Sequence, residues 1–290
     1  MYLYYGLIFI SVAMFGGCFA LNDVYRERRG SSLKISMEAS FIGAVAAIIC
    51  LIIINKFKFE FTPFTLIMGV ISAANAIGFT VFSFKALNSI NISLYSLFSM
   101  LGGMALPFAQ GIIFYGEKIT VAKIICVIFI CLALACTVTR GEKSRGYIYY
   151  AGVFVLNGTS GVLSKLFNEL PYEKTSAAGY TFWIAACTLV LSGVLWMALA
   201  LKKSSDEPKI KAFDCAIGAI NGGMNRIANF LLVIALMHVD ASVQYPAVTG
   251  GVMIVSTLIC FFGQRKPSKK ELVAVALAFV GTLALFVIPI

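Results

Sequence analysis

The chain has 290 residues, of which 60% are hydrophobic and 12% are charged. Together with a mean hydropathy of +0.92, this excludes an ordinary soluble domain, in which about 25% of residues carry a charge. The formal net charge of +10 does not predict nucleic-acid binding, because the cations are dispersed over short segments between apolar runs. Anionic lipid headgroups explain such cations better, so we expect membrane lipid and no nucleic acid as a partner.

Ten apolar runs of about twenty residues follow one another, each long enough to cross a bilayer as a helix. The segments between them are too short to form another domain, so we predict an all-α integral membrane protein with ten transmembrane helices. The first run lacks the basic start and cleavage site of a secretory signal, so we expect it to be retained. The runs lie near residues 2–22, 33–55, 63–85, 91–115, 119–139, 147–167, 177–201, 211–236, 241–263 and 270–289.

The two halves of the chain resemble each other in sequence. A shift of 149 residues aligns the third and fourth runs with the eighth and ninth, and a shift of about 146 aligns parts of the first and sixth. Because each half has five runs, the second copy must enter the membrane from the opposite side. We therefore predict two inverted five-helix repeats, residues 1–145 and 146–290, around a central cavity, as in many secondary transporters. The matched pairs include Gly69 with Gly218, Ser93 with Ser242, Gly102 with Gly251, Met104 with Met253, Gly6 with Gly152, and Asn22 with Asn168.

Each half also has a short polar hairpin before its last run, FYGEKITVAK at 114–123 and FGQRKPSKKE at 262–271. With ten runs in two halves, these hairpins resemble the EamA-type members of the drug/metabolite transporter superfamily. Members usually carry Gly-Glu in both hairpins, and here Gln264 replaces the second carboxylate. The resemblance implies a multi-pass protein of the plasma (cytoplasmic) membrane that transports or exports a small metabolite or drug by alternating access.

The cations are divided unequally between the two sides of the predicted membrane. Sixteen follow odd-numbered runs and six follow even-numbered runs, so the positive-inside rule places both termini outside. The resemblance implies termini in the cytoplasm, which leaves the orientation open. The larger set is Arg26, Arg28, Arg29, Lys34, Lys85, Arg140, Lys143, Arg145, Lys202, Lys203, Lys209, Lys211, Arg265, Lys266, Lys269 and Lys270; the smaller is Lys56, Lys58, Lys118, Lys123, Lys165 and Lys174.

The eighth run carries a polar side, on which Arg226 lies with three asparagines at four-residue steps, Asn221, Asn225 and Asn229. A central arginine costs about 2.5–3.5 kcal/mol in lipid, so this side must face protein or a wet cavity. No acidic residue lies near the middle of any run, and Glu38 is the nearest candidate partner. An unpaired guanidinium predicts binding of a carboxylate or phosphate of a solute, whereas one held by helix carbonyls or Glu38 would be structural.

Further candidate substrate-binding residues lie in other runs, and each has an alternative role in helix packing. Asn157 belongs to a stripe of small and polar residues, and Asn75 is a lone central amide. Tyr245 and Thr249 lie close to Pro246. A proline interrupts the hydrogen bonding of a helix, so we expect backbone carbonyls there that are free to line a substrate site. Ser96 lies one to two turns before a Gly-Gly pair in the fourth run.

No catalytic constellation is found in the sequence. The eight cysteines are dispersed singly without zinc-site spacing, and there is no histidine cluster, nucleophile elbow or phosphate-binding loop. We expect no metal, no cofactor, no enzymatic activity and no ATP hydrolysis within this chain.

The leading hypothesis is therefore a secondary-active transporter of small anionic or zwitterionic metabolites such as amino acids, acting as a monomer or homodimer. The alternatives are a multidrug or cationic-compound exporter, which would need an intramembrane carboxylate, and a lipid-carrier translocase, in which Arg226 would hold a headgroup phosphate. An intramembrane enzyme or a scaffold is disfavoured by the missing catalytic set and by the apparent repeat.

Overall fold

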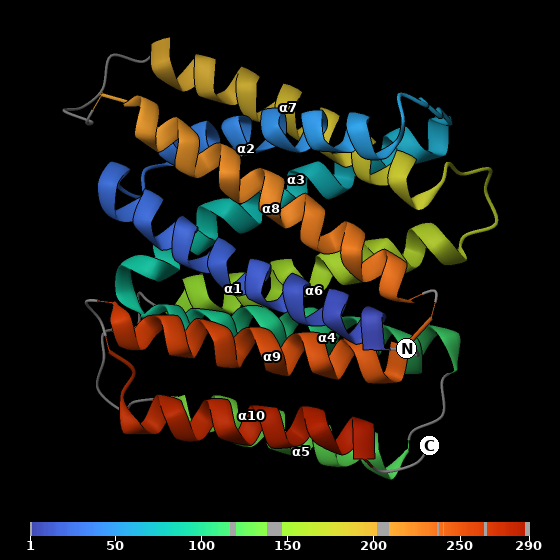
Figure 1. Ribbon diagram of the computed structural model, residues 1–290, viewed down its shortest axis with the longest axis vertical. Helices are drawn as coiled ribbons and strands as arrows, with labels where there is room; N and C mark the ends of the chain where they lie inside the picture. The colour runs from blue at the N-terminus through green and yellow to red at the C-terminus, as the bar shows by residue number, and fades with distance from the viewer. Residues whose placement is uncertain are drawn as a thin grey trace.

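A computed structural model describes residues 2–116, 120–137, 147–201, 209–236, 238–239, 241–263 and 266–287, without the side chains of residues 123, 134, 137, 233, 236, 241–246 and 285–287. The described residues form ten α-helices and no strand (Figure 1). The helices are α1 (Tyr2–Arg29), α2 (Leu33–Ile54), α3 (Pro63–Ser89), α4 (Ile92–Tyr115), α5 (Val121–Thr137), α6 (Tyr147–Glu169), α7 (Ala177–Leu201), α8 (Ala212–Leu236), α9 (Ala241–Phe262) and α10 (Lys269–Val287).

The first helix is longer than the apolar run that predicts it. α1 continues beyond residue 22 to Arg29, and Gly30 follows with a φ of +102°. The added turns are polar, and Arg26 pairs with Asp23 one turn earlier on the same helix. A hydropathy pattern does not predict these turns, because they are polar. Ion pairs stabilise them, and a glycine in a left-handed conformation ends the helix.

Side-chain caps fix the beginnings of three helices. Ser32, Thr62 and Asn91 each accept a hydrogen bond from the backbone N–H three residues further on, at the starts of α2, α3 and α4. The start of α7 is stabilised by a residue of another segment, because the backbone N–H of Ser176 donates a hydrogen bond to the carboxylate of Glu60. That hydrogen bond lowers the pKa of the exposed Glu60 carboxyl and fastens the α2–α3 connection to the start of α7.

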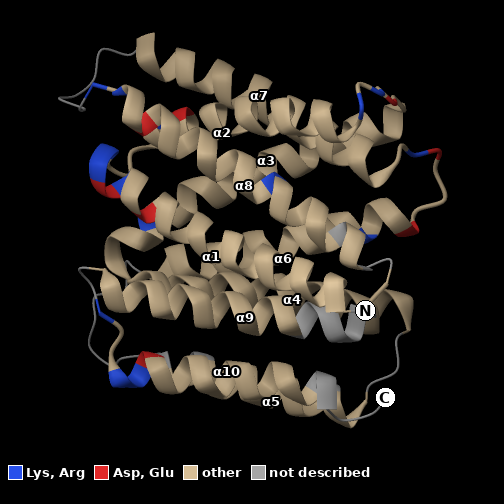
Figure 2. Cartoon of the chain, viewed as in Figure 1, with Lys and Arg blue, Asp and Glu red and all other residues tan. Residues whose placement is uncertain are grey.

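Five of the helices in the described part of the chain, α1, α2, α3, α4 and α7, are long and apolar enough to cross a membrane. Figure 2 shows that most charged residues gather at the two ends of the helices, with largely uncharged helices between. This distribution is that of a helical membrane protein, whose apolar middle faces hydrocarbon and whose charged ends reach water.

Helices from the two halves of the chain are interleaved. α1 packs on α8 and α9, as α6 packs on α3 and α4, and α2 packs on α8 as α7 packs on α3. The α2–α7, α4–α9 and α5–α10 pairs join corresponding helices directly. Figure 1 shows α5 and α10 together at one end of the long axis, and α2 and α7 near the other. Most of the strong contacts between two helices therefore have a counterpart between the two helices that lie five places away from them in the chain.

The correspondence extends to single glycine contacts. A Cβ built on Gly102 would lie 2.1 Å from the carbonyl oxygen of Phe154, and one built on Gly251 would lie 2.9 Å from Val12. The two glycines, on α4 and α9, are 149 residues apart, and their partners, on α1 and α6, are 142 residues apart. The two contacts therefore correspond between the halves of the chain. The same separations relate two further contacts, Gly16 on Val255 and Gly158 on Leu106.

Candidate functional site

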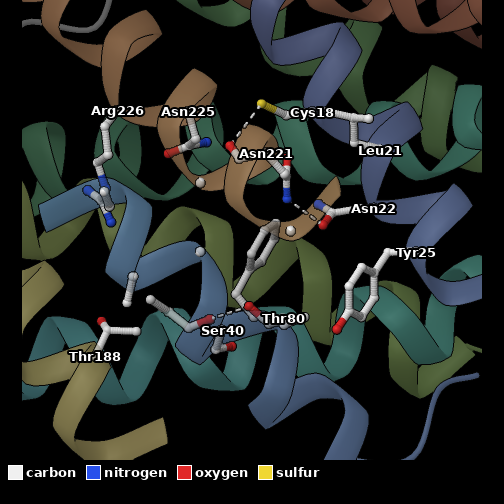
Figure 3. Close-up of a pocket in the computed structure, with 18 of the residues that line it drawn as sticks. Cys18, Leu21, Asn22, Tyr25, Ser40, Thr80, Thr188, Asn221, Asn225 and Arg226 are labelled. Carbon is white, nitrogen blue, oxygen red and sulfur yellow. Dashed lines mark hydrogen bonds between the residues drawn. The ribbon is translucent and has the colours of Figure 1, made fainter. Parts of the chain in front are cut away.

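Helices α1, α2, α3, α7 and α8 line a partly open cavity of about 210 Å³ (Figure 3). This is the liquid volume of about seven water molecules, so it could hold a small solute. α2 contributes small residues to the lining, including Ala39, Gly43, Ala44 and Ala47, which leave the space open. Polar side chains come from α1, α2, α3, α7 and α8, so the cavity joins both halves of the chain.

Arg226 lines this cavity from the middle of α8. Figure 3 shows its side chain extending from α8 toward α2 and Thr188 of α7. Its guanidinium has no hydrogen-bond or ion-pair partner among the described residues. Arg226 is half-buried, and a cation that is largely removed from bulk water normally requires a paired anion or several acceptors. The cavity therefore presents an uncompensated guanidinium, which can bind a carboxylate or phosphate through two parallel hydrogen bonds.

Glu38 is not the partner of Arg226. Its carboxylate accepts hydrogen bonds from Arg29 Nε and Nη2, both at 2.9 Å, and from the Tyr25 hydroxyl at 2.8 Å. All three side chains are buried. The acid is therefore occupied at the α1–α2 end of the cavity, and the structural alternative in which it neutralises Arg226 does not apply.

The three asparagines of α8 behave differently from one another. Asn221 and Asn225 line the cavity with Arg226, and the Asn221 side-chain N–H donates to Asn22 Oδ1 at 2.8 Å. Asn229 does not line it, because its amide turns back to the carbonyl oxygen of Asn225 at 2.7 Å. The predicted ladder thus has two members at the cavity and one beyond it.

Asn75 and Asn157 lie at helix interfaces outside the cavity lining. Asn75 donates to the carbonyl oxygen of Leu156 at 3.0 Å, and Asn157 donates to that of Ser99 at 2.6 Å. Both bonds join one of the first five helices to α6. These amides are used for packing in this conformation, which is the alternative that the sequence leaves open for them.

Ser96 and Thr249 also lie outside the cavity lining. Ser96 is fully buried and donates to the carbonyl oxygen of Ser93 in its own helix. Thr249 is buried in α9, which packs on α1, α4 and α10. The side chain of Tyr245 lies outside the described residues, as do Glu117 and Gln264 of the two polar hairpins.

Several lining residues were not predicted as site residues. Cys18, Asn22 and Tyr25 of α1 line the cavity with Ser40 of α2 and Thr80 of α3. The three α1 residues are spaced by four and three positions, so they share one helix face. That spacing is the signal in the sequence, but a stripe of Cys, Asn and Tyr in an apolar run also suits ordinary packing.

One end of the cavity is bounded by a buried cluster formed by Tyr25, Ile35, Phe84 and Ile217, here called the Tyr25 cluster. Tyr25 and Ile217 also line the cavity. The Arg29–Glu38 pair adjoins this cluster through the hydrogen bond from Tyr25 to Glu38. The aromatic cluster and the ion pair therefore lie beside this part of the cavity lining.

A second buried cluster joins α3, α6 and α7, and its α3 residue lies near the beginning of that helix, whereas Phe84 of the Tyr25 cluster lies near the end. It consists of Met68, Leu163, Phe167 and Tyr180, here called the Tyr180 cluster, in which the Phe167 and Tyr180 rings stack with centroids 3.9 Å apart. Phe167 corresponds to Tyr25 at the separation of 142, and Met68 corresponds to Ile217 at 149. The two clusters are thus counterparts, but only the first is linked to an ion pair among the described residues.

Comparison with known proteins identifies the fold and no more. The chain is similar to a solved crystal structure of a protein, with a TM-score of 0.62, 18% sequence identity, and coverage of 96% of this chain and 94% of that chain. No protein-family model and no curated protein matches the chain. The whole helical arrangement therefore has a counterpart of known structure, while the function must be argued from the cavity.

Proposed function

We propose that this protein is a secondary-active membrane transporter of small anionic or zwitterionic metabolites, such as amino acids, and an EamA-type member of the drug/metabolite transporter superfamily. The observation that carries the proposal is the unpartnered guanidinium of Arg226 in a cavity shared by both halves of the chain. Ten membrane crossings and a plasma-membrane location are part of the same proposal.

The charge of the cavity supports an anionic group on the solute. No acidic side chain is found among its lining residues within the described ranges. A cation bound beside Arg226 would face like-charge repulsion in a medium of low dielectric constant, where charges interact strongly. The alternative of a cationic-compound exporter has no carboxylate there to support it.

The paired helix contacts support two inverted five-helix repeats, with boundaries near residues 145 and 146. Exchange of each helix for its counterpart preserves most of the packing order. It also relates the Gly102–Phe154 contact to the Gly251–Val12 contact, and the Gly16–Val255 contact to the Gly158–Leu106 contact. An odd number of crossings in each half would invert the second copy. Two such copies can exchange conformations, which is the basis of alternating access.

The Tyr25 and Tyr180 clusters supply the closures that such a cycle requires. Opening the helices around one cluster would connect the cavity to one side of the membrane, while the other cluster stays packed. Because the clusters involve different ends of the helices, the two openings would lead to opposite sides. Energy would come from a solute or ion gradient, since the sequence has no phosphate-binding loop.

A ligand screen followed by transport assays tests the proposal. The purified protein is heated with amino acids, organic acids, nucleosides, cationic dyes and a polyprenyl phosphate. A ligand at a hundred times its Kd stabilises a protein by about 2.7 kcal/mol, which is readily measured. Ligands that raise the melting temperature are then tested for counterflow in proteoliposomes.

Replacement of Arg226 provides the decisive comparison. We expect Arg226→Ala to abolish counterflow of an acidic or zwitterionic solute and Arg226→Lys to retain part of it, because lysine keeps the charge and loses the bidentate geometry. Lys209→Ala, which removes an exposed cation outside the cavity lining, is the matched control. Undiminished transport by a folded Arg226→Ala protein would exclude the proposed role, and stabilisation by cationic dyes alone would favour the cation exporter.

A further inference from the structure

A second cavity, of about 370 Å³, is lined by α4, α5 and α6 and is separate from the cavity that contains Arg226. Its lining side chains within the described ranges carry no charge, and apart from two tyrosine hydroxyls they are apolar. Burial of a polar group without a partner is unfavourable, so this cavity suits an apolar occupant. We call it the α5–α6 groove, and it is lined by Phe98, Ala135, Tyr147, Tyr150, Ala151, Phe154 and Val155.

The floor of the α5–α6 groove is aromatic and fixed in place. The ring centroids of Phe98 and Tyr150 are 5.6 Å apart, and those of Tyr150 and Tyr147 are 5.8 Å apart. α4 and α6 pack backbone against backbone beside these rings, because a Cβ built on Gly102 would lie 2.1 Å from the carbonyl oxygen of Phe154. Two helices in such close contact cannot approach further to fill the space.

The α5 side of the groove is loosely packed compared with the corresponding helices of the second half. There, α10 packs on α9, and a Cβ built on Gly250 would lie 2.7 Å from the ring of Phe279. In the first half, α5 packs on α10 and has only slight contact with α4. Ala135 of α5 and Ala151 of α6 are exposed at the rim of the groove. The first half therefore lacks much of a helix contact that the second half makes, and the groove lies beside the missing contact.

The size of the groove favours an acyl chain over another protein. Its volume corresponds to about twelve groups of the size of a water molecule, and a methylene group is of similar size. Lipid acyl chains are the apolar molecules that surround a membrane helix. Seven residues line the groove, whereas a stable protein interface uses about 20–30 residues on each side.

Basic residues lie on the side of the membrane where the groove ends. α5 ends there and α6 begins there with Tyr147, and tyrosines are enriched at the membrane–water interface. If all ten helices cross, α10 also begins on this side, and its first two residues, Lys269 and Lys270, are exposed. Figure 2 shows the basic start of α10, the helix that packs on α5. The next residue, Glu271, accepts a hydrogen bond from Asn91 of α4. Such lysines attract the headgroup of an anionic lipid.

We propose that the α5–α6 groove binds one anionic phospholipid as a structural component of the protein. One acyl chain covers the rings of Phe98 and Tyr150, and the headgroup lies at the membrane surface near Lys269 and Lys270. The lipid takes the place of the helix packing that is weak between α5 and α4. This inference does not depend on the identity of the solute or on Arg226.

Lipid retention by the full-length protein tests the inference. The protein is purified in detergent, washed until the amount of bound phospholipid is constant, and its lipids are extracted and counted per chain. We expect a single phospholipid to remain and to be anionic. Phosphatidylglycerol added to the delipidated protein should raise its melting temperature, because a ligand that binds only the folded state stabilises it. Phosphatidylcholine with the same acyl chains should raise it less.

Variants locate the two parts of the lipid. Ala151→Trp places an indole in the groove, so it should remove the retained lipid and the stabilisation by phosphatidylglycerol. Val190→Trp is the matched control, because Val190 is exposed on α7 and lies outside the groove, and it should retain both. Replacement of Lys269 and Lys270 together by glutamine should remove the preference for phosphatidylglycerol while a phospholipid is still retained.

Several results would overturn the inference. A folded wild type that retains no phospholipid and is not stabilised by phosphatidylglycerol would do so, as would equal retention by wild type and Ala151→Trp. Conversion of a dimer into a monomer by Ala151→Trp, with its lipid kept, would show that a second copy of the chain covers the groove. Ala135→Phe enters the groove from α5 and supplies the same comparison if Ala151→Trp does not fold.

Discussion

Gly222 marks the closest approach of α8 to α2. A Cβ built on it would lie 2.2 Å from the carbonyl oxygen and 2.5 Å from the Cα of Gly43. Backbone atoms cannot move aside as the end of a side chain can, so any larger residue must separate the two helices. Gly222 and Gly43 both line the cavity, and their contact therefore sets its width.

We predict that Gly222→Ala destabilises the protein by about 1–3 kcal/mol, the usual cost of inserting atoms into a packed interior. Solute binding should weaken as well, because the separation of α2 and α8 displaces Arg226 from the opposite side of the cavity. The free energy of unfolding in a denaturant titration and the Kd of the solute measure the two effects.

Gly223→Ala is the neighbouring control. A Cβ at that position would meet Cys50 Sγ at 3.5 Å, an ordinary contact. Alanine also favours a helix over glycine by up to about 1 kcal/mol. Equal losses in both variants would mean that helix propensity or expression, and not the α2–α8 contact, accounts for the result at Gly222.

Single side chains show how far the sequence can define the site. The helical repeat is sufficient to place Asn221, Asn225 and Arg226 on one side of α8, because only backbone geometry is needed. It does not separate Asn75 and Asn157 from the site, since their partners are backbone carbonyls of other helices. Every residue offers such a carbonyl, so no pattern of residue types identifies the bond.

At the scale of helices, α1 and α2 are joined by a buried ion pair near their shared turn. Arg29 and Glu38 contact each other at 2.8 Å, with side chains 5% and 4% exposed. We predict that Glu38→Gln, which keeps the shape and removes the charge, destabilises the protein by about 3–5 kcal/mol, because it leaves a buried guanidinium uncompensated. The shift of the thermal unfolding midpoint in detergent measures this effect.

Glu27→Gln serves as the comparison for Glu38→Gln. Glu27 also contacts an arginine, Arg26, at 3.4 Å, but its side chain is 39% exposed. Exposed pairs contribute about 0–1 kcal/mol. If the two variants melted at the same temperature, the Arg29–Glu38 pair would not hold the α1–α2 end of the cavity.

Helices as elements were largely predictable, and their ends less so. All ten predicted runs coincide with a helix within a few residues at most ends, because long apolar segments have few alternatives. The extension of α1 to Arg29 was not predicted, since its last turns depend on charges that pair with each other and with partners on other helices, such as Asp214 on α8. Those partners are distant in sequence.

For the whole molecule, the helix order predicts which connections share a side of the membrane. If all ten helices cross, the segment around Lys58, between α2 and α3, lies opposite the segment around Lys209, before α8. In a background without the native cysteines, Lys58→Cys and Lys209→Cys should react with an impermeant maleimide from opposite sides of intact vesicles. Labelling of both from one side would contradict the ten-crossing arrangement.

The same experiment decides the orientation. The positive-inside rule predicts that Lys209 lies on the cytoplasmic side, and the family resemblance predicts the reverse. The proposed repeat was suggested by the sequence, but the register of its first helices differs between the sequence alignment and the glycine contacts. The shift of about 146 and the separation of 142 differ by roughly one helical turn, and alignments one turn apart match similar faces.

Under the proposed transport cycle, the unequal chemistry of the Tyr25 and Tyr180 clusters would affect the two directions of movement differently. Parting the first exposes the Arg29–Glu38 charges to water and salt, whereas parting the second exposes mainly rings. In a protein that alternates between two access states, those states would differ in free energy even between identical solutions. Such a carrier has a resting bias toward one leaflet, and ionic strength on a single side of the membrane would adjust it.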